Sequence, residues 1–171
     1  MGSVAVLGLG PSLSLFNPAD YFLSIGVNDI WRYVKTDVVV CLDRAGIFKP
    51  DRLKVINECK PQAFYSQIVN WDTRADFKKI DFIPGYPDNF VQFETPALHK
   101  SFCSPFVACQ IAFKDYHASE IHLFGVDLVN HPNLDNALCT KIKIHFKNLK
   151  TALSQRGCSL VIHGDGILKD I

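Results

Sequence analysis

The sequence lacks several features that mark specialised classes of protein. Lysine and arginine total 18 against 17 aspartate and glutamate residues, so there is no basic excess of the kind that nucleic-acid binders show. No apolar run reaches the roughly 18 residues that cross a bilayer. Residues 1–9 are apolar but carry no basic segment or small-residue cleavage site of a secretory signal. We therefore expect a cytoplasmic protein with no membrane span and no nucleic-acid partner.

Motifs of metal sites and of several hydrolases are also missing. There is no CxxC pair, no HExxH, no GxSxG and no Cys/His spacing of a zinc site. The six cysteines are scattered, and a chain of this size and apolar content needs no disulfide staples. We expect free thiols and no structural metal.

What is present is an ordinary globular composition. The 171 residues are 48% hydrophobic, 12% aromatic and 20% charged, which excludes a disordered chain. This length matches one domain, so residues 1–171 are expected to share a single core.

Apolar, β-branched runs alternate with helical patterns along the chain. Continuous apolar runs are typical of parallel strands buried on both faces. The alternation predicts a three-layer α/β domain with a mostly parallel sheet. The expected strands are 3–7, 21–27, 36–42, 63–65, 120–124 and 159–163, and the expected longer helices are 50–59, 104–117 and 135–155.

Residues 66–100 break this alternation. The stretch contains Pro84, Pro87 and Pro96, and no helical period survives in it. A loop of this length in a compact domain is usually functional or mobile. We expect a lid or specificity region here, with one short strand near 90–93.

A glycine-rich loop follows the first predicted strand. Gly8 and Gly10 allow close approach to a phosphate, which the loop amides and the Ser12 hydroxyl are expected to bind. Pro11 and Ser12 lead to no third glycine of a dinucleotide fingerprint, and no GK[ST] of a P-loop occurs. A side chain at Gly10 is expected to block the ligand and leave the fold intact. The alternative is a tight turn without a ligand.

Polar residues follow other predicted strands on the same edge. Asn28-Asp29 and Asp43 come after the second and third strands, and Asp127 comes after the strand at 120–124. Carboxylates at strand ends bind ribose hydroxyls or metals, although Asp and Asn also cap helices. Ser104-Pro105 is typical of a helix start, with Ser104 as the N-cap and free amides that attract an anion.

These motifs together resemble a known family. Gly8-Leu9-Gly10-Pro11-Ser12-Leu13, then Gly26-Val27-Asn28-Asp29, and then Ser104 to Ala108 with Gly125-Val126-Asp127, are similar to the motifs of a Rossmann-like transferase group. That group contains bacterial sialyltransferases and MptE-like 6-hydroxymethylpterin diphosphokinases. The resemblance covers both ends of the chain and leaves its middle uncovered. Leu9 stands where the family usually has asparagine, and Pro105 stands where it usually has glycine.

The resemblance implies roles for particular residues. Asn28 and the glycine loop would hold a nucleotide, and Ser104 would face its phosphate or base. Asp43 or Asp127 would orient the donor. A sialyltransferase also needs a general base, and histidine suits that task near neutral pH. His131 is the preferred base because it lies in a loop on the ligand side; the competitors are His145 and His163.

Three functions follow from these residues. The first is a small sialyltransferase-like glycosyltransferase with a CMP-sugar donor, which requires no cofactor. The second is an MptE-like diphosphokinase that uses ATP and Mg²⁺, with Asp29, Asp43 or Asp127 as metal ligands. The third is a catalytically inactive module that binds or sequesters a nucleotide. The expected partners are a nucleotide or nucleotide sugar and a small-molecule or glycan acceptor, and a homo-oligomer stays open.

Overall fold

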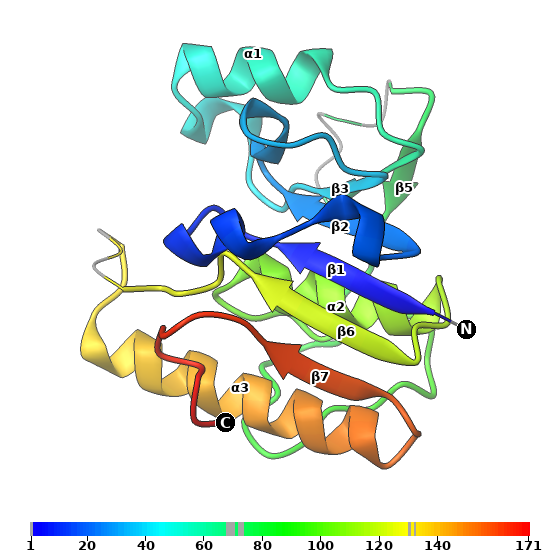
Figure 1. The fold of residues 1–171 in the computed structure, drawn as a ribbon, viewed down its shortest axis with the longest axis vertical. Coiled ribbons are helices and arrows are strands. Elements are labelled where there is room, and N and C mark those ends of the chain that lie inside the picture. Colours follow the sequence, from blue (N-terminus) through cyan, green and yellow to red (C-terminus); the bar gives the residue numbers. More distant parts are fainter. Residues whose placement is uncertain (1, 68–70, 72–73, 130, 132) are drawn as a thin grey trace.

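The computed structural model describes residues 2–67, 71, 74–129, 131 and 133–171. Within these ranges seven strands form one sheet in the order β5-β4-β3-β2-β1-β6-β7 (Figure 1). Each pair of neighbouring strands is parallel, which confirms the predicted mostly parallel sheet. The strands are β1 (Ser3–Leu7), β2 (Leu23–Val27), β3 (Val38–Val40), β4 (Ala63–Ser66), β5 (Phe77–Lys79), β6 (Glu120–Phe124) and β7 (Ser159–Ile162).

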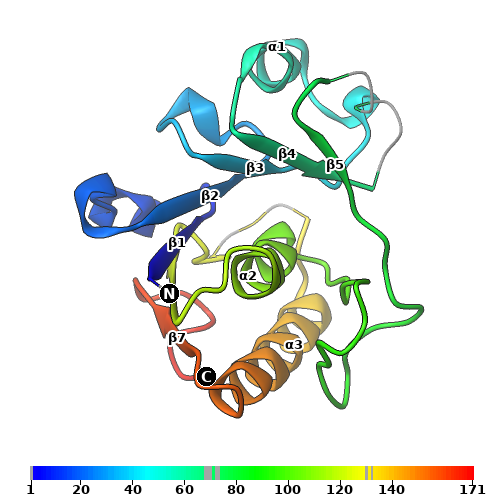
Figure 2. The same ribbon diagram turned by 90° about the vertical axis from the view of Figure 1, so that its right-hand side faces the viewer.

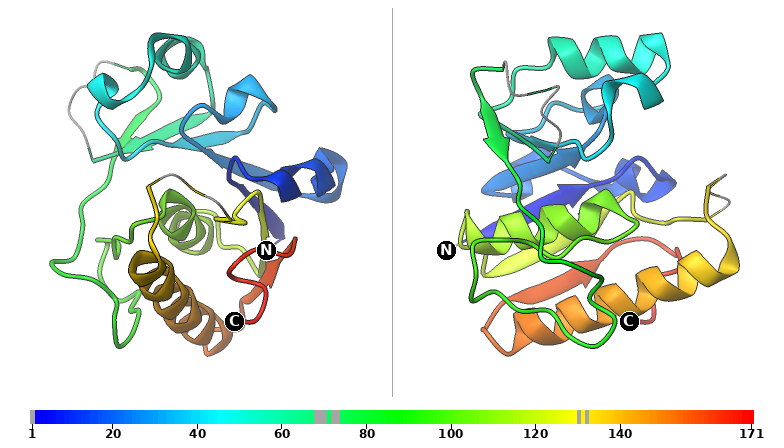
Figure 3. Two further views of the ribbon diagram at one scale, coloured as in Figure 1. Left: turned by 90° about the vertical axis from the view of Figure 1, so that its left-hand side faces the viewer. Right: turned by 180° about the vertical axis from the view of Figure 1, so that it is seen from behind.

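Helices cover both faces of this sheet, as a three-layer Rossmann-like domain requires. Helices α2 (Ser104–Lys114) and α3 (Asn136–Ser154) pack on one face, and α1 (Pro50–Glu58) lies on the other (Figures 2 and 3). Alternate residues of the central strands supply two separate apolar clusters. Val4 and Val6 face α2 and α3, whereas Ala5 and Leu7 join the cluster on the side of α1. Burial of both faces explains why these strands are continuously apolar.

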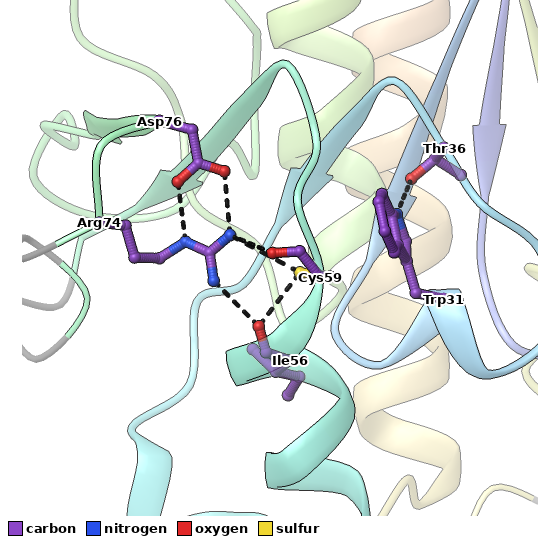
Figure 4. Close-up of polar contacts among 6 residues, drawn as sticks. All are labelled: Trp31, Thr36, Ile56, Cys59, Arg74 and Asp76. Carbon is purple, nitrogen blue, oxygen red and sulfur yellow. Dashed lines mark hydrogen bonds and ion pairs between the residues drawn. The ribbon is translucent and has the colours of Figure 1, made fainter.

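Helix α1 is anchored by a polar cluster at its C-terminal end (Figure 4). The Arg74 guanidinium donates to the carbonyl oxygens of Ile56 at 3.0 Å and Cys59 at 2.7 Å, which lie in and just after the last turn. It also forms a two-point pair with Asp76, through bonds of 3.0 and 2.9 Å. A cation near helix carbonyls that lack partners stabilises that helix end. The cluster therefore fixes α1 against the segment that leads into β5.

The order of the strands reverses between β1 and β6. From β1 the chain adds β2 to β5 on one side and then returns to place β6 and β7 on the other. Ligands of open parallel sheets bind beyond the carboxyl ends of the strands at such a switch point. The loop after β1 and the loop after β6 meet there, with Gly8 N–H donating to Phe124 O at 2.8 Å.

Two sequence predictions about the irregular region are wrong. No strand forms at 90–93, because the Gln92 amide donates to Nε2 of His99 rather than to a neighbouring strand. A strand forms instead at Phe77–Lys79, which pairs with β4 at the edge of the sheet. Its half-buried and exposed residues produce no apolar run.

The predicted N-cap of helix α2 is shifted by one residue. Cys103, not Ser104, is the N-cap, and its side chain makes no capping hydrogen bond.

The segment before α2 is tied down by side chains rather than by regular structure. His99 and Gln110 exchange two hydrogen bonds of 2.8 Å between backbone and carboxamide. Lys114 donates to the carbonyl oxygens of Thr95 and Ala97. Val91 and Leu98 are buried in the cluster beneath α2. This part of the predicted lid region is therefore packed against helix α2.

The thiol prediction is confirmed, since all six cysteines are free and five of them are buried. None of the helices in the described ranges combines the length and the apolar character that a membrane crossing needs. The cysteines are Cys41, Cys59, Cys103, Cys109, Cys139 and Cys158.

Candidate functional site

A cavity of about 590 Å³ opens at the switch point, beyond the carboxyl ends of β1 and β6. Its lining comes from the loops after β1, β2, β3 and β6, from the N-terminus of α2 and from the start of α3. The predicted residues that line it are Gly8, Gly10, Pro11, Asn28, Asp43, Ser104 and His131. The further lining residues are Leu9, Val27, Phe102, Cys103, Pro105, Gly125, Val126, Leu128, Val129, Asn133, Leu134 and Leu138.

The glycine loop forms the floor of this cavity by packing closely on the loop after β6. A Cβ atom at Gly10 would lie 2.5 Å from Oδ2 of Asp127 and 2.9 Å from the oxygen of Gly125. A Cβ at Gly8 would also collide with the Gly125 carbonyl. The expectation that a side chain at Gly10 leaves the fold intact is therefore wrong. These glycines are required by the contact between two loops, whether or not a ligand is bound.

The amides of Gly8, Gly10 and Ser12 donate within the protein and are not available to a phosphate. Gly10 N–H donates to Gly125 O at 2.7 Å, and Gly8 N–H is engaged by Phe124 O. The Ser12 N–H donates to Oδ2 of Asp127 at 2.9 Å. These donors complete the structure of the protein itself, because a buried backbone N–H requires a partner.

Ser12 and Asp127 form a buried lock between the two loops and do not line the cavity. The Ser12 hydroxyl donates to Asp127 Oδ2 at 2.8 Å and accepts from the Gly125 N–H at 2.8 Å. The sequence placed Ser12 on the phosphate and Asp127 on the donor. In the structure the hydroxyl and the carboxylate bond to each other beneath the glycine loop, and neither residue is part of the lining.

Asn28 differs from Ser12 and Asp127, because one of its acceptor atoms has no hydrogen-bond partner among the described residues. It follows β2 with a backbone φ of +53°, a left-handed conformation that asparagine tolerates better than most residues. Its Oδ1 atom is buried and has no hydrogen-bond partner among the described residues. Leaving a buried acceptor unpaired costs about 1–3 kcal/mol. A ligand that donates to this oxygen would recover that cost.

The N-terminus of α2 forms another wall of the cavity. Cys103, Ser104 and Pro105 all line it, and the N-cap side chain leaves the first turn uncapped. The positive end of the helix dipole and the first-turn N–H groups favour an anion there. Burial raises the pKa of the Cys103 thiol to about 12, so this cysteine is no nucleophile near neutral pH.

Of the three histidines that the sequence offered as bases, His131 is the one that lines the cavity. Its side chain is exposed, and its Nδ1 accepts from the Asn133 N–H at 3.3 Å. His145 is buried on α3, where both ring nitrogens have partners. His163 lies on the side of Tyr21 and Phe124, with its Nε2 at 2.8 Å from Nδ1 of His122.

The three carboxylates that the diphosphokinase hypothesis offered as alternative metal ligands have different surroundings. Asp29 is 2% exposed and pairs with Arg52, whose Nε lies 3.0 Å from Oδ2. Asp127 is held by Ser12, and among the described lining residues Asp43 is the one carboxylate. Across the described part of the chain, no group of three His, Cys, Asp or Glu side chains is placed to hold a metal ion.

The wall also contains residues that the sequence did not indicate. Phe102, Val129, Leu134 and Leu138 line the cavity, and no lysine or arginine does so among the described residues. Leu138 belongs to the apolar period of α3, but that pattern alone does not show which ligand or element the residue faces. No described residue of 66–100 lines the cavity, and residues 68–70 and 72–73 of the predicted lid region lie outside the described residues.

The fold resembles that of solved glycosyltransferases. No family model and no curated protein matches the sequence. A mutant of the alpha-2,3/8-sialyltransferase CstII matches with a TM-score of 0.57 and 16% identity, covering 94% of this chain and 81% of that one. The sialyltransferase CstII from Campylobacter jejuni in complex with the substrate analogue CMP-3FNeuAc matches with a TM-score of 0.48 and 15% identity, covering 94% and 86%. At such identity the first match establishes the shared fold.

Proposed function

We propose that this protein is a glycosyltransferase that moves a sugar from a CMP-sugar donor to a hydroxyl of a glycan or small-molecule acceptor. The observation that carries the proposal is Asn28, which lines a cavity at the switch point and whose buried Oδ1 has no hydrogen-bond partner among the described residues. Nucleotides bind at such points, and their amino and hydroxyl groups are the donors that this oxygen lacks. The sialyltransferase-like fold supports the same function.

The charge of the cavity favours a donor with one phosphate. A CMP-sugar carries a single phosphodiester, whereas nucleoside diphosphate sugars carry two phosphates. The described lining offers one carboxylate and no lysine or arginine. The single charge of that phosphodiester suits the N-terminus of α2 together with the Ser104 hydroxyl, since such helix ends bind single anionic groups without a cation. Asp43, which is exposed at the end of β3, would accept from a ribose hydroxyl.

His131 would act as the general base. Its imidazole would take the proton of the acceptor hydroxyl as the new bond between that oxygen and the anomeric carbon forms. The bond between the anomeric carbon and the phosphate oxygen breaks at the same time, and CMP leaves with the electron pair. The amide end of α2 would stabilise the charge on the departing phosphate. Asp127 would position the floor of the cavity through Ser12 without touching the donor.

The first experiment is a thermal-shift panel with CMP, CDP, UDP, GDP, ADP and ATP, each with and without Mg²⁺. A ligand at 100 times its dissociation constant adds about 2.7 kcal/mol of stability, a shift of several degrees. CMP without Mg²⁺ is expected to raise the melting temperature most. A rise in melting temperature that requires both ATP and Mg²⁺ would favour the diphosphokinase function instead.

A kinetic test follows for His131. His131→Ala is expected to reduce turnover of a CMP-sugar by about 10²-fold, because general bases contribute on that order. The affinity for CMP is expected to stay near that of the wild type, since the base faces the acceptor rather than the nucleotide. Full activity of this variant would remove His131 from the mechanism.

A second candidate function is nucleotide binding without transfer. Leu9 lines the cavity with 38% of its surface exposed, and Pro105 in the first turn of α2 has no N–H to donate. Both residues remove a donor from a site that needs donors. CMP binding with no turnover of any CMP-sugar, and no gain of turnover in Leu9→Asn, would favour this candidate.

A further inference from the structure

His145 joins α3 to the irregular segment that precedes α2. Its imidazole is 0% exposed. Nδ1 lies 2.8 Å from the Ser101 hydroxyl, and Nε2 lies 3.1 Å from Oδ1 of Asp88. The ring also stacks with Tyr86 and Phe102, at centroid distances of 5.9 and 6.1 Å. A single side chain therefore fixes several points of a segment that has no ladder of its own.

The contact with Asp88 places one proton of the ring. A carboxylate only accepts, so Nε2 carries the hydrogen that faces Asp88. In the neutral ring Nδ1 is then an acceptor, and the Ser101 hydroxyl donates to it. Both nitrogens are satisfied, as a fully buried imidazole requires.

Serine, histidine and aspartate in contact suggest a catalytic triad, but the geometry excludes that role. The ring that would move the proton is closed to solvent, and Asp88, the residue that should be sheltered, is 63% exposed. Ser101 does not line the cavity described above. A nucleophile needs room for a substrate beside it, and this hydroxyl points at a buried ring.

The position of Ser101 in the chain indicates a different role. It directly precedes residues 102–105, which all line the cavity. These residues also lead into α2, whose N-cap side chain makes no hydrogen bond of its own. The bond from Ser101 to His145 is therefore a tether for the wall, immediately before its first residue.

We propose that His145 is a positioning residue that sets the place of the cavity wall at 102–105 and of the amide end of α2. This inference rests on the proposed function, because the wall matters to catalysis if a nucleotide phosphate lies against it. The ring acts through its hydrogen bond with Ser101, and it does not touch the ligand.

Two substitutions separate the two bonds of His145. The carboxamide of asparagine reaches the place of Nδ1, so His145→Asn keeps an acceptor for Ser101 and loses the bond to Asp88. The longer carboxamide of glutamine reaches the place of Nε2, so His145→Gln keeps Asp88 and loses Ser101. We expect CMP to bind about tenfold more weakly to His145→Gln and to Ser101→Ala, and with near wild-type affinity to His145→Asn.

Asn148 provides a matched control on the next turn of α3. Its Nδ2 donates to Pro87 O at 2.9 Å, so it ties the same irregular segment to the same helix without reaching Ser101. Asn148→Ala is expected to lower the melting temperature and leave CMP affinity unchanged. If His145→Gln and Asn148→Ala lower the melting temperature alike and neither weakens CMP binding, His145 is a structural residue and the proposal is overturned.

Hydrogen exchange in the absence of any nucleotide tests the tether by itself. Peptides that cover 102–110 are expected to exchange faster in Ser101→Ala and His145→Gln than in Asn148→Ala. Equal exchange in all three variants overturns the positioning role, and Ser101→Ala keeps the test valid if a His145 variant does not fold. If the wild type binds no nucleotide, the proposed function fails while the exchange result still decides what His145 does.

Discussion

At the scale of single residues, the site combines side chains whose hydrogen bonds are satisfied with one whose acceptor is not. Ser12 and Asp127 have satisfied hydrogen bonds and lie beneath the floor of the cavity. Asn28 lies in its wall with an unpaired oxygen. A polar group whose bonds are complete stabilises the fold, whereas one whose bonds are incomplete is available to a ligand. The sequence offers all three as polar residues after strands and cannot separate these states.

Asn28→Gly is the substitution that tests the unpaired oxygen most directly. Glycine keeps the left-handed backbone conformation at φ +53° and removes the carboxamide. We expect CMP affinity to fall at least about tenfold, the loss of one hydrogen bond to a buried acceptor. Stability is expected not to fall, because removal of the unpaired oxygen recovers its cost and offsets the greater entropy of glycine in the unfolded chain. Calorimetric titration and thermal unfolding measure the two effects, and unaltered affinity would place the nucleotide elsewhere.

Asp127→Ala tests the lock beneath the floor. The substitution leaves the Ser12 N–H and hydroxyl without their acceptor in a buried place. We expect the free energy of unfolding to fall by about 2–3 kcal/mol, with Ser12→Ala partly non-additive to it. Urea unfolding of both single variants and of the double variant measures the coupling. Additive losses would contradict a shared lock.

At the scale of elements, the order of the strands decides which loops and helix ends come into contact. The loops after β1 and β6 touch because their strands are neighbours, although they are far apart in the sequence. Glycines at 8, 10 and 125 permit that contact, since a Cβ at any of them would collide with the facing loop. Helix α1 depends likewise on Arg74, which approaches it from the segment before β5.

Arg74→Ala is expected to loosen α1 without altering the cavity. It removes the guanidinium from two carbonyl oxygens and from Asp76, and it uncovers the Phe64 ring, whose centroid lies 4.2 Å away. A hydrogen bond to a charged group is worth about 1.5–3 kcal/mol, and water can replace the guanidinium at most of its partners in this partly exposed place, so a net loss of about 2–3 kcal/mol is expected. Faster hydrogen exchange in α1 with unchanged CMP affinity is the expected result. Weaker CMP binding would show that α1 and the cavity are coupled.

At the scale of the whole molecule, the buried His99 and the half-buried His163 link stability to pH. Burial lowers the pKa of His99 below 6.5, and the charge of Lys114 lowers it further. Burial also lowers the pKa of His163, with a second contribution from His122. The unfolded chain titrates near pH 6.5, so between the two pKa values it binds more protons than the folded chain does.

The free energy of unfolding is therefore expected to fall as the pH decreases from 7 through 6.5. Each histidine contributes at most about 1.4 kcal/mol per pH unit. His99→Gln, whose carboxamide oxygen replaces Nε2 as the acceptor for the Gln92 N–H, is expected to make this dependence shallower. Urea unfolding between pH 5.5 and 7.5 measures it. Constant stability across that range would contradict the expected proton linkage.

The sequence by itself determined the layers and the edge that bears the site. Runs such as Val38–Val40 have one stable solution, which is a strand buried on both faces of a parallel sheet. Polar residues after such strands must then meet at one edge. The local sequence pattern did not predict the strand Phe77–Lys79. This polar edge strand forms because it pairs with β4, and its own residues show no apolar run.

Only the tertiary structure decided the role of each polar residue at that edge. It turned Asp127 and Ser12 toward each other, left Asn28 Oδ1 unpaired, and placed His131 in the wall while it buried His145. The physical reason is that hydrogen bonding depends on which loops come within about 3 Å of each other. That proximity follows from strand order and close packing, and the sequence of a single loop predicts neither of them.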